Sequence, residues 1–99
     1  MTRLRIEWDP LKAAANKRKH GISFEEAATA FYDDEGIVID DPEHSKGEDR
    51  FILLGMSRSL RLLIVCHCYH EGPGVIRIIS ARKADRSERR QFRGGQRAE

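Results

Sequence analysis

The sequence predicts a single α+β domain, because its helical patterns come early and its strand patterns follow one another later. The 99 residues suit one domain. We expect the order β-α-α-β-β-β-β-α, with a curved antiparallel sheet that the two early helices cover on one face. The domain is expected to span residues 1–93, and residues 94–99 are expected to form a flexible tail.

The N-terminal residues predict a short strand followed by a helix. Apolar and charged residues alternate over residues 4–8, which is typical of a strand. Asp9 followed by Pro10 is typical of a helix N-cap and of the first helical position. Gly21 suits the C-cap of the same helix, because glycine readily adopts the left-handed conformation found there.

Two capping-box signatures predict the remaining helices. Ser23 has Glu26 three residues later, and Asp85 has Glu88 at the same spacing. The last helix is expected to stop at Gly94-Gly95. The helix after Ser23 has an apolar stripe that recurs every three or four residues. Its members are Phe24, Ala27, Ala28 and Phe31.

Four apolar runs between these helices predict strands. They occupy residues 36–39, 51–56, 60–69 and 75–81. The run at 60–69 is long and β-branched in its middle, so we expect a central strand there. Residues 40–49 form a polar connection, and short turns rich in serine, glycine and proline separate the later strands.

The charges are segregated along the chain although the net charge is only +2. Residues 1–20 carry a net +4, residues 21–49 a net −9, residues 50–81 a net +3 and residues 82–99 a net +4. Such segregation indicates a dipolar surface with at least one basic face, although each cluster can also be an ordinary solvated surface.

Arginines in or beside the predicted strands are the main candidates for chemistry. A strand interior is an unusual place for arginine unless its face meets solvent or an anion, and guanidinium groups suit phosphate geometry. The alternative is that these arginines pair with the acidic residues of 33–49. The candidates are Arg50, Arg61, Arg77 and Arg82.

Strand alternation places these arginines on particular faces. Arg61 is expected to share a face with Leu63, Val65, His67 and Tyr69, and Arg77 with Val75, Ile79 and Ala81. Arg77 and Arg82 are five residues apart, so a regular strand directs them to opposite faces. Only a bulge or the end of the strand brings both to one phosphate. Otherwise Arg82 is expected to anchor the last helix or the acidic connection.

No metal site, cofactor motif or membrane span is expected. The four histidines are scattered, and Cys66 and Cys68 lie too close along one strand to form a disulfide, so free thiols in a reducing cytoplasm are expected. No apolar run is long enough to cross a membrane. His44 and Glu48 could supply acid–base chemistry or could simply be solvated loop residues.

Beyond these patterns, the chain resembles the BrnT family of toxins from bacterial type II toxin–antitoxin modules. The resemblance runs from Trp8 to Phe92. It is carried by Trp8-Asp9, Lys12, Asn16, Lys19-His20-Gly21, Phe24 to Ala27, Phe31, Asp33, His44, Glu48-Asp49-Arg50, Gly55, Arg61, Arg77 to Arg82, Ala84 and Glu88-Arg89. Family members often have tyrosine near Phe92, so packing is the expected role of Phe92. They often have glycine at the position of Leu60, so the turn before Arg61 is expected to differ from theirs.

The resemblance implies a RelE-like ribonuclease fold and RNA cleavage that stops translation in the cytoplasm. It also implies a BrnA-like ribbon-helix-helix antitoxin that forms a heteromeric complex with the toxin, which reaches DNA only through that partner. The alternative is a degenerate toxin that binds protein or nucleic acid without catalysis. A third possibility is a metal-dependent nuclease.

A metal-independent reaction, in which the 2′-hydroxyl attacks the adjacent phosphate, assigns roles to specific residues. Arg61, Arg77 and Arg82 are expected to bind the phosphate and stabilise the transition state. His44 or Glu48 is the candidate base. The further residues expected to contact RNA are Lys19, His20, Arg50 and Arg89, with Lys19 or His20 as the candidate acid.

Overall fold

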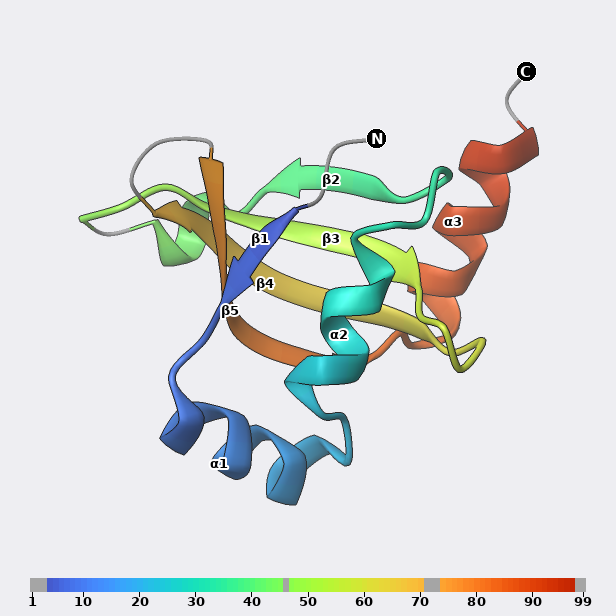
Figure 1. Cartoon of the computed structure of the whole chain (residues 1–99). Coiled ribbons are helices and arrows are strands. Elements are labelled where there is room, and N and C mark those ends of the chain that lie inside the picture. The colour runs from blue at the N-terminus through green and yellow to red at the C-terminus, as the bar shows by residue number, and fades with distance from the viewer. Residues whose placement is uncertain (1–3, 46, 71–73, 98–99) are drawn as a thin grey trace.

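The computed structural model describes residues 4–45, 47–70 and 74–97, in which five strands form one sheet and three α-helices pack against it (Figure 1). The strands are β1 (Arg5–Glu7), β2 (Ile37–Asp40), β3 (Arg50–Met56), β4 (Leu62–His70) and β5 (Val75–Lys83). The α-helices are α1 (Pro10–His20), α2 (Phe24–Ala30) and α3 (Arg86–Arg97), and a 3-10 turn covers Pro42–His44. None of the helices in the described ranges is long and apolar enough to span a membrane.

The order of the elements along the chain is the predicted one, but the sheet is mixed rather than wholly antiparallel. The strand order is β1-β5-β4-β3-β2. Strands β2 to β5 pair antiparallel, whereas β1 runs parallel to β5 and places Glu7 opposite Arg77. The prediction missed this because β1 and β5 are distant in sequence, so no hairpin dictates the direction of β1.

Helix α1 begins and ends where its capping residues predict. The Asp9 carboxylate accepts a hydrogen bond from the Leu11 amide at 2.8 Å. Gly21 has a φ of 72° and donates its amide to the Lys17 carbonyl. This left-handed conformation is where glycine costs least, so the predicted C-cap is confirmed.

The two capping boxes differ in one respect. At α3, the Glu88 amide donates to the Asp85 carboxylate, and the Asp85 amide donates to the Glu88 carboxylate, each at 2.8 Å. At α2, the Glu26 amide donates to the Ser23 hydroxyl at 3.0 Å. The Glu26 carboxylate instead accepts a hydrogen bond from Arg61, so only half of that box forms.

The C-terminal end of α3 departs from the prediction. The helix continues through Gly94-Gly95 to Arg97, so the expected stop at the glycine pair is wrong. Glycine disfavours a helix interior by about 1 kcal/mol per residue relative to alanine, which weakens a helix without forbidding it. The boundary between a domain at 1–93 and a tail at 94–99 stays a prediction.

The sheet has a separate apolar cluster on each face. Helices α1 and α2 cover one face, as predicted, and α3 packs on the other (Figure 1). The cluster under α1 and α2 contains Ile22, Phe24, Ala27, Ala30, Leu53, Leu63, Val65, Ile78 and Ala81. The cluster under α3 contains Leu54, Ile64, Ala84 and Phe92. Phe92 is buried there, which confirms its expected role in packing.

A bulge in β5 overturns the predicted alternation of that strand. Cys66 lies opposite Ser80 and His67 lies opposite Ile78, so Ile79 has no residue opposite it on β4. Ala81 therefore belongs to the cluster under α1 and α2. The expectation that Ala81 shares a face with Arg77 is wrong, because the extra residue inverts the alternation.

Asn16 ties α1 to the part of β5 that β1 does not reach. The Ala81 amide donates to the Asn16 side-chain oxygen at 3.0 Å, and the Asn16 amide donates to the Ala81 carbonyl at 2.9 Å. The same nitrogen also donates to the Ile22 carbonyl. The buried side chain thus satisfies main-chain groups that would otherwise lack partners.

Asn16→Ala is expected to lower the free energy of unfolding by about 3 kcal/mol, because it leaves several buried main-chain groups unpaired. Urea denaturation measures this change. Lys17→Ala, at the exposed neighbouring position, is the matched control and should stay within about 0.5 kcal/mol of wild type. Equal stability of Asn16→Ala and the control would contradict the role of Asn16.

His67 is fully buried among aromatic rings on the face under α2. Its ring lies edge-on to Phe31 with centroids 4.8 Å apart, and Phe51 and Tyr69 lie nearby. Nδ1 lies 3.1 Å from the Val65 carbonyl, whereas Nε2 has no hydrogen-bond partner among the described residues. Burial lowers the pKa of His67 below its ordinary value of 6.5, so the neutral ring is favoured.

This lowered pKa makes stability depend on pH. Below pH 6.5 the unfolded chain binds a proton at His67 before the folded chain does, so the free energy of unfolding falls as the pH falls through that window. His67→Phe should remove the contribution of His67 to this slope between pH 6.5 and about 5.5, above the ordinary pKa of 4.5 at which Glu26 and Glu88 titrate in the unfolded chain. Urea denaturation across this range tests it; identical slopes in the two proteins would refute it.

Candidate functional site

A row of polar side chains crosses the sheet on the face opposite α1 and α2. The strand register aligns Arg50 of β3 with Cys68 of β4, Cys68 with Arg77 of β5, and Arg77 with Glu7 of β1. Residues paired in this way point to the same face. Arg50 and Arg77 are two strands apart, or about 10 Å between their main chains, so both guanidinium groups can reach a ligand above Cys68.

Each arginine of this row has a carboxylate neighbour and keeps donors free. The Arg77 Nε lies 3.3 Å from a Glu7 oxygen, and about half of the Arg77 side chain is exposed. The Arg50 Nε lies 3.7 Å from a Glu48 oxygen, which is too long for a hydrogen bond. That nitrogen is buried and has no hydrogen-bond partner among the described residues. The row is therefore charged, accessible and incompletely satisfied.

His44 stands beside this row on the 3-10 turn. Its Nδ1 lies 3.0 Å from both oxygens of Asp41. Asp41 is buried, and its amide donates to the Arg50 carbonyl at 2.9 Å. One Asp41 oxygen also lies 3.9 Å from the Cys66 sulfur, on the same face as Cys68. Asp41 thus fixes the histidine ring next to the arginine row, while most of the His44 side chain is exposed.

Asp41 was not among the candidates predicted from sequence. The signal that could have revealed it is its position three residues before His44 across Pro42, a spacing that a single helical turn brings together. The Asp41 carbonyl also accepts a hydrogen bond from Ser45 at 2.7 Å, and the Arg50 amide donates to the same serine hydroxyl at 3.0 Å. The turn and the start of β3 therefore form one hydrogen-bonded unit.

Cys68 of the row and Cys66, two residues before it on β4, are free thiols, as expected. Burial raises the pKa of Cys66 and of Cys68, so both stay protonated near neutral pH. Glu48 raises the pKa of Cys68 further, which places that carboxylate over the row. In the described part of the chain, no three histidine, cysteine or acidic side chains come together as a metal site.

Arg82 shares the face of Arg77 because of the bulge, but it serves a different neighbour. Its partner residue on β4 is four positions from that of Arg77, which separates the two by about 13 Å. Arg82 makes a two-point contact with Glu88 at 2.9 and 2.8 Å. The contact lowers the pKa of Glu88 and raises that of Arg82. Arg82 therefore holds the first turn of α3 to β5.

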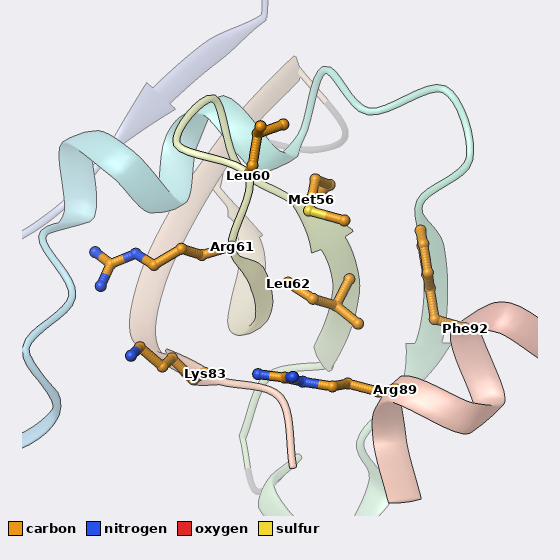
Figure 2. Close-up of a pocket in the computed structure, with 7 residues that line it drawn as sticks. All are labelled: Met56, Leu60, Arg61, Leu62, Lys83, Arg89 and Phe92. Atoms are coloured by element: carbon orange, nitrogen blue, oxygen red, sulfur yellow. The ribbon is translucent and has the colours of Figure 1, made fainter. Parts of the chain in front are cut away.

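The remaining candidates lie away from the row. Arg61 donates two hydrogen bonds to Glu26 of α2, on the opposite face, and lowers the pKa of that carboxylate. Lys19 and His20 belong to the last turn of α1, whose packing is also on that side. Arg89 projects from α3 into a separate pocket beyond the end of β5 (Figure 2).

Comparisons with known proteins identify the family and the fold. The chain matches the family described as "Ribonuclease toxin, BrnT, of type II toxin-antitoxin system" over residues 8–88. No curated protein sequence matches it significantly. A similar solved structure is the Brucella abortus ribonuclease toxin BrnT, with a TM-score of 0.65 and 24% identity over 85% of this chain and 100% of that one. At that identity the structural match supports the fold, and the family match covers most of the chain. The chain therefore belongs to the BrnT family of ribonuclease toxins of type II toxin–antitoxin systems.

Proposed function

We propose that the protein is a metal-independent endoribonuclease whose active site is the row formed by Arg50, Cys68 and Arg77, together with His44. The observation that carries the proposal is the shared face of these residues, which come from three strands and one turn. Membership of a ribonuclease toxin family supports RNA as the substrate.

Arg50 and Arg77 suit the scissile phosphate. Guanidinium groups on both sides of Cys68 supply fixed donors where negative charge develops on the phosphorane. The Arg50 side chain is 30% exposed, so its outer nitrogens can donate to a phosphate oxygen while Nε stays buried. Glu48 lies beside Arg50 and fits a role in positioning that guanidinium better than a role as the base.

His44 suits proton transfer. Because Asp41 accepts a hydrogen bond from Nδ1, the tautomer with a free lone pair on Nε2 is favoured. That nitrogen could take the proton of the RNA 2′-hydroxyl, whose oxygen then attacks the adjacent phosphorus to form a 2′,3′-cyclic phosphate. The bond from phosphorus to the 5′-oxygen breaks, and the 5′-oxygen leaves as a hydroxyl after it takes a proton from water. Asp41 is assigned the role of positioning residue, because it orients the ring and does not face substrate itself.

The other predicted catalytic residues fit structural roles. Arg61 is held by Glu26 on the opposite face, and Arg82 is held by Glu88 at α3. Lys19 and His20 complement the C-terminal end of α1, where positive charge is favourable. The finer parts of the proposal are inhibition of translation by RNA cleavage, a RelE-like relationship of the fold, and neutralisation by a ribbon-helix-helix antitoxin.

Arg77→Ala and His44→Ala are each expected to lower kcat/KM for RNA cleavage by about 100-fold or more. A fixed donor to a transition-state oxyanion and a positioned base each contribute at least this much. The assay uses antitoxin-free protein, a fluorescently labelled RNA and an excess of chelator. Arg58→Ala, at an exposed arginine in the turn between β3 and β4, is the matched control and should keep full activity.

Three results would count against this proposal. Loss of wild-type cleavage in the presence of chelator would indicate a metal-dependent nuclease. RNA binding without cleavage by the wild type would indicate a non-catalytic module. Full activity of Arg77→Ala and His44→Ala would show that the row is not the active site.

Arg82→Ala is expected to act through stability. Loss of its contact with Glu88 should destabilise the first turn of α3, and a double-mutant cycle with Glu88→Ala should give a coupling energy of about 1 kcal/mol for this half-exposed pair. Urea denaturation provides the four stabilities of the cycle. An Arg82→Ala protein that unfolds like wild type but cleaves as poorly as Arg77→Ala would show instead that Arg82 acts in catalysis.

A further inference from the structure

A second basic region surrounds a pocket of about 330 Å³ at the end of the sheet, away from the proposed active site (Figure 2). Arg61, Lys83 and Arg89 place their nitrogen atoms on one side of it. The apolar side chains that line it are Met56, Leu60, Leu62 and Phe92. The pocket therefore combines positive charge with an apolar wall.

The positive charge of this pocket is only partly neutralised. Glu26 binds the Arg61 guanidinium through two hydrogen bonds. Lys83 lies near enough to Glu26 to lower its pKa slightly, but neither Lys83 nor Arg89 forms a direct ion pair with a carboxylate of the described residues. Glu26 thus binds only one of the three cations directly, and an anionic ligand would complete the site.

Leu60, at the edge of the pocket, combines an unusual main-chain conformation with high exposure. Its φ is 62°, the left-handed conformation that leucine rarely adopts, and the residue is 81% exposed. Such a conformation disfavours folding by about 1 kcal/mol or more. An exposed leucine gains nothing from burial in the free protein, so neither packing nor turn geometry explains this residue. A partner that covers the Leu60 side chain would explain why leucine is present there.

The chemistry of the pocket favours a peptide over RNA. Phosphates would use Lys83 and Arg89, but RNA has little use for an exposed leucine beside Met56 and Leu62. Phe92 is buried, so its ring is not presented for base stacking. Carboxylates that meet the cations, with an apolar side chain that enters the pocket, match both halves of the site.

We propose that this pocket binds an acidic segment of the cognate antitoxin, with one apolar side chain of that segment seated against Leu60 and Met56. A type II toxin family implies such a partner, so the inference depends on family membership and not on the proposed cleavage site. The antitoxin would then bind the toxin at the end of the sheet as well as at the place where it covers the active site.

The test measures the affinity of purified full-length antitoxin from the same module for variants of this chain. Lys83→Glu combined with Arg89→Glu should weaken binding about tenfold or more, equivalent to roughly 1.4 kcal/mol. Leu60→Gly should weaken it several-fold while keeping or raising Tm, because glycine suits that φ. Arg86→Glu combined with Arg90→Glu, exposed on the same helix but outside the pocket, is the matched control and should change affinity less than about twofold.

RNA cleavage is measured on the same variants and separates the two possible ligands. The Lys83 and Arg89 double variant should cleave RNA at close to the wild-type rate. Reduced cleavage with unchanged antitoxin affinity would assign the pocket to RNA and overturn the proposal. An equal loss of affinity in the control pair, or wild-type affinity in both pocket variants, would overturn it as well.

Discussion

The extra residue in β5 is the constraint on which the rest of the structure depends. With Ile79 unpaired, Ile78 and Ala81 both enter the core under α1 and α2, while Arg77 and Arg82 both emerge on the opposite face. Without the bulge, strand alternation would direct Arg82 toward the buried cluster and Ala81 away from it. Arg82 could then not bind Glu88 and hold α3 against β5. One inserted residue thus lets β5 place apolar side chains in the core and arginines on the opposite face.

The acidic connection between β2 and β3 helps to position basic side chains on the charged face. Two of its carboxylates have basic neighbours, because Asp41 is buried against His44 and Glu48 lies beside Arg50. These two acidic groups each help to set the position of a basic side chain. The same principle holds at α2 and α3, where Glu26 binds Arg61 and Glu88 binds Arg82. Arginines that keep donors free beside such a partner, as Arg50 and Arg77 do, then mark where ligands are expected.

Local features of the sequence predicted the elements well, and long-range pairing explains what they missed. Caps such as Asp9 and Gly21 act within one helical turn, so their effects are visible in sequence. The bulge at Ile79 depends on register between strands, which alternation alone cannot reveal. The parallel pairing of β1 and the link from Asn16 to Ala81 join residues far apart in the chain. His44 was recognised as a candidate, but its buried partner Asp41 looked like one more residue in an acidic stretch.

In the proposed reaction, the scissile phosphate lies over Cys68 between Arg50 and Arg77. The most direct test is a crystal structure with a short RNA that carries a 2′-deoxy substitution at the cleavage position, which removes the attacking hydroxyl. We expect the phosphate oxygens to lie within hydrogen-bonding distance of both guanidinium groups. We also expect the His44 Nε2 to face the substituted 2′ carbon. An RNA bound instead on the face of α1 and α2, or in the pocket of Lys83 and Arg89, would contradict it.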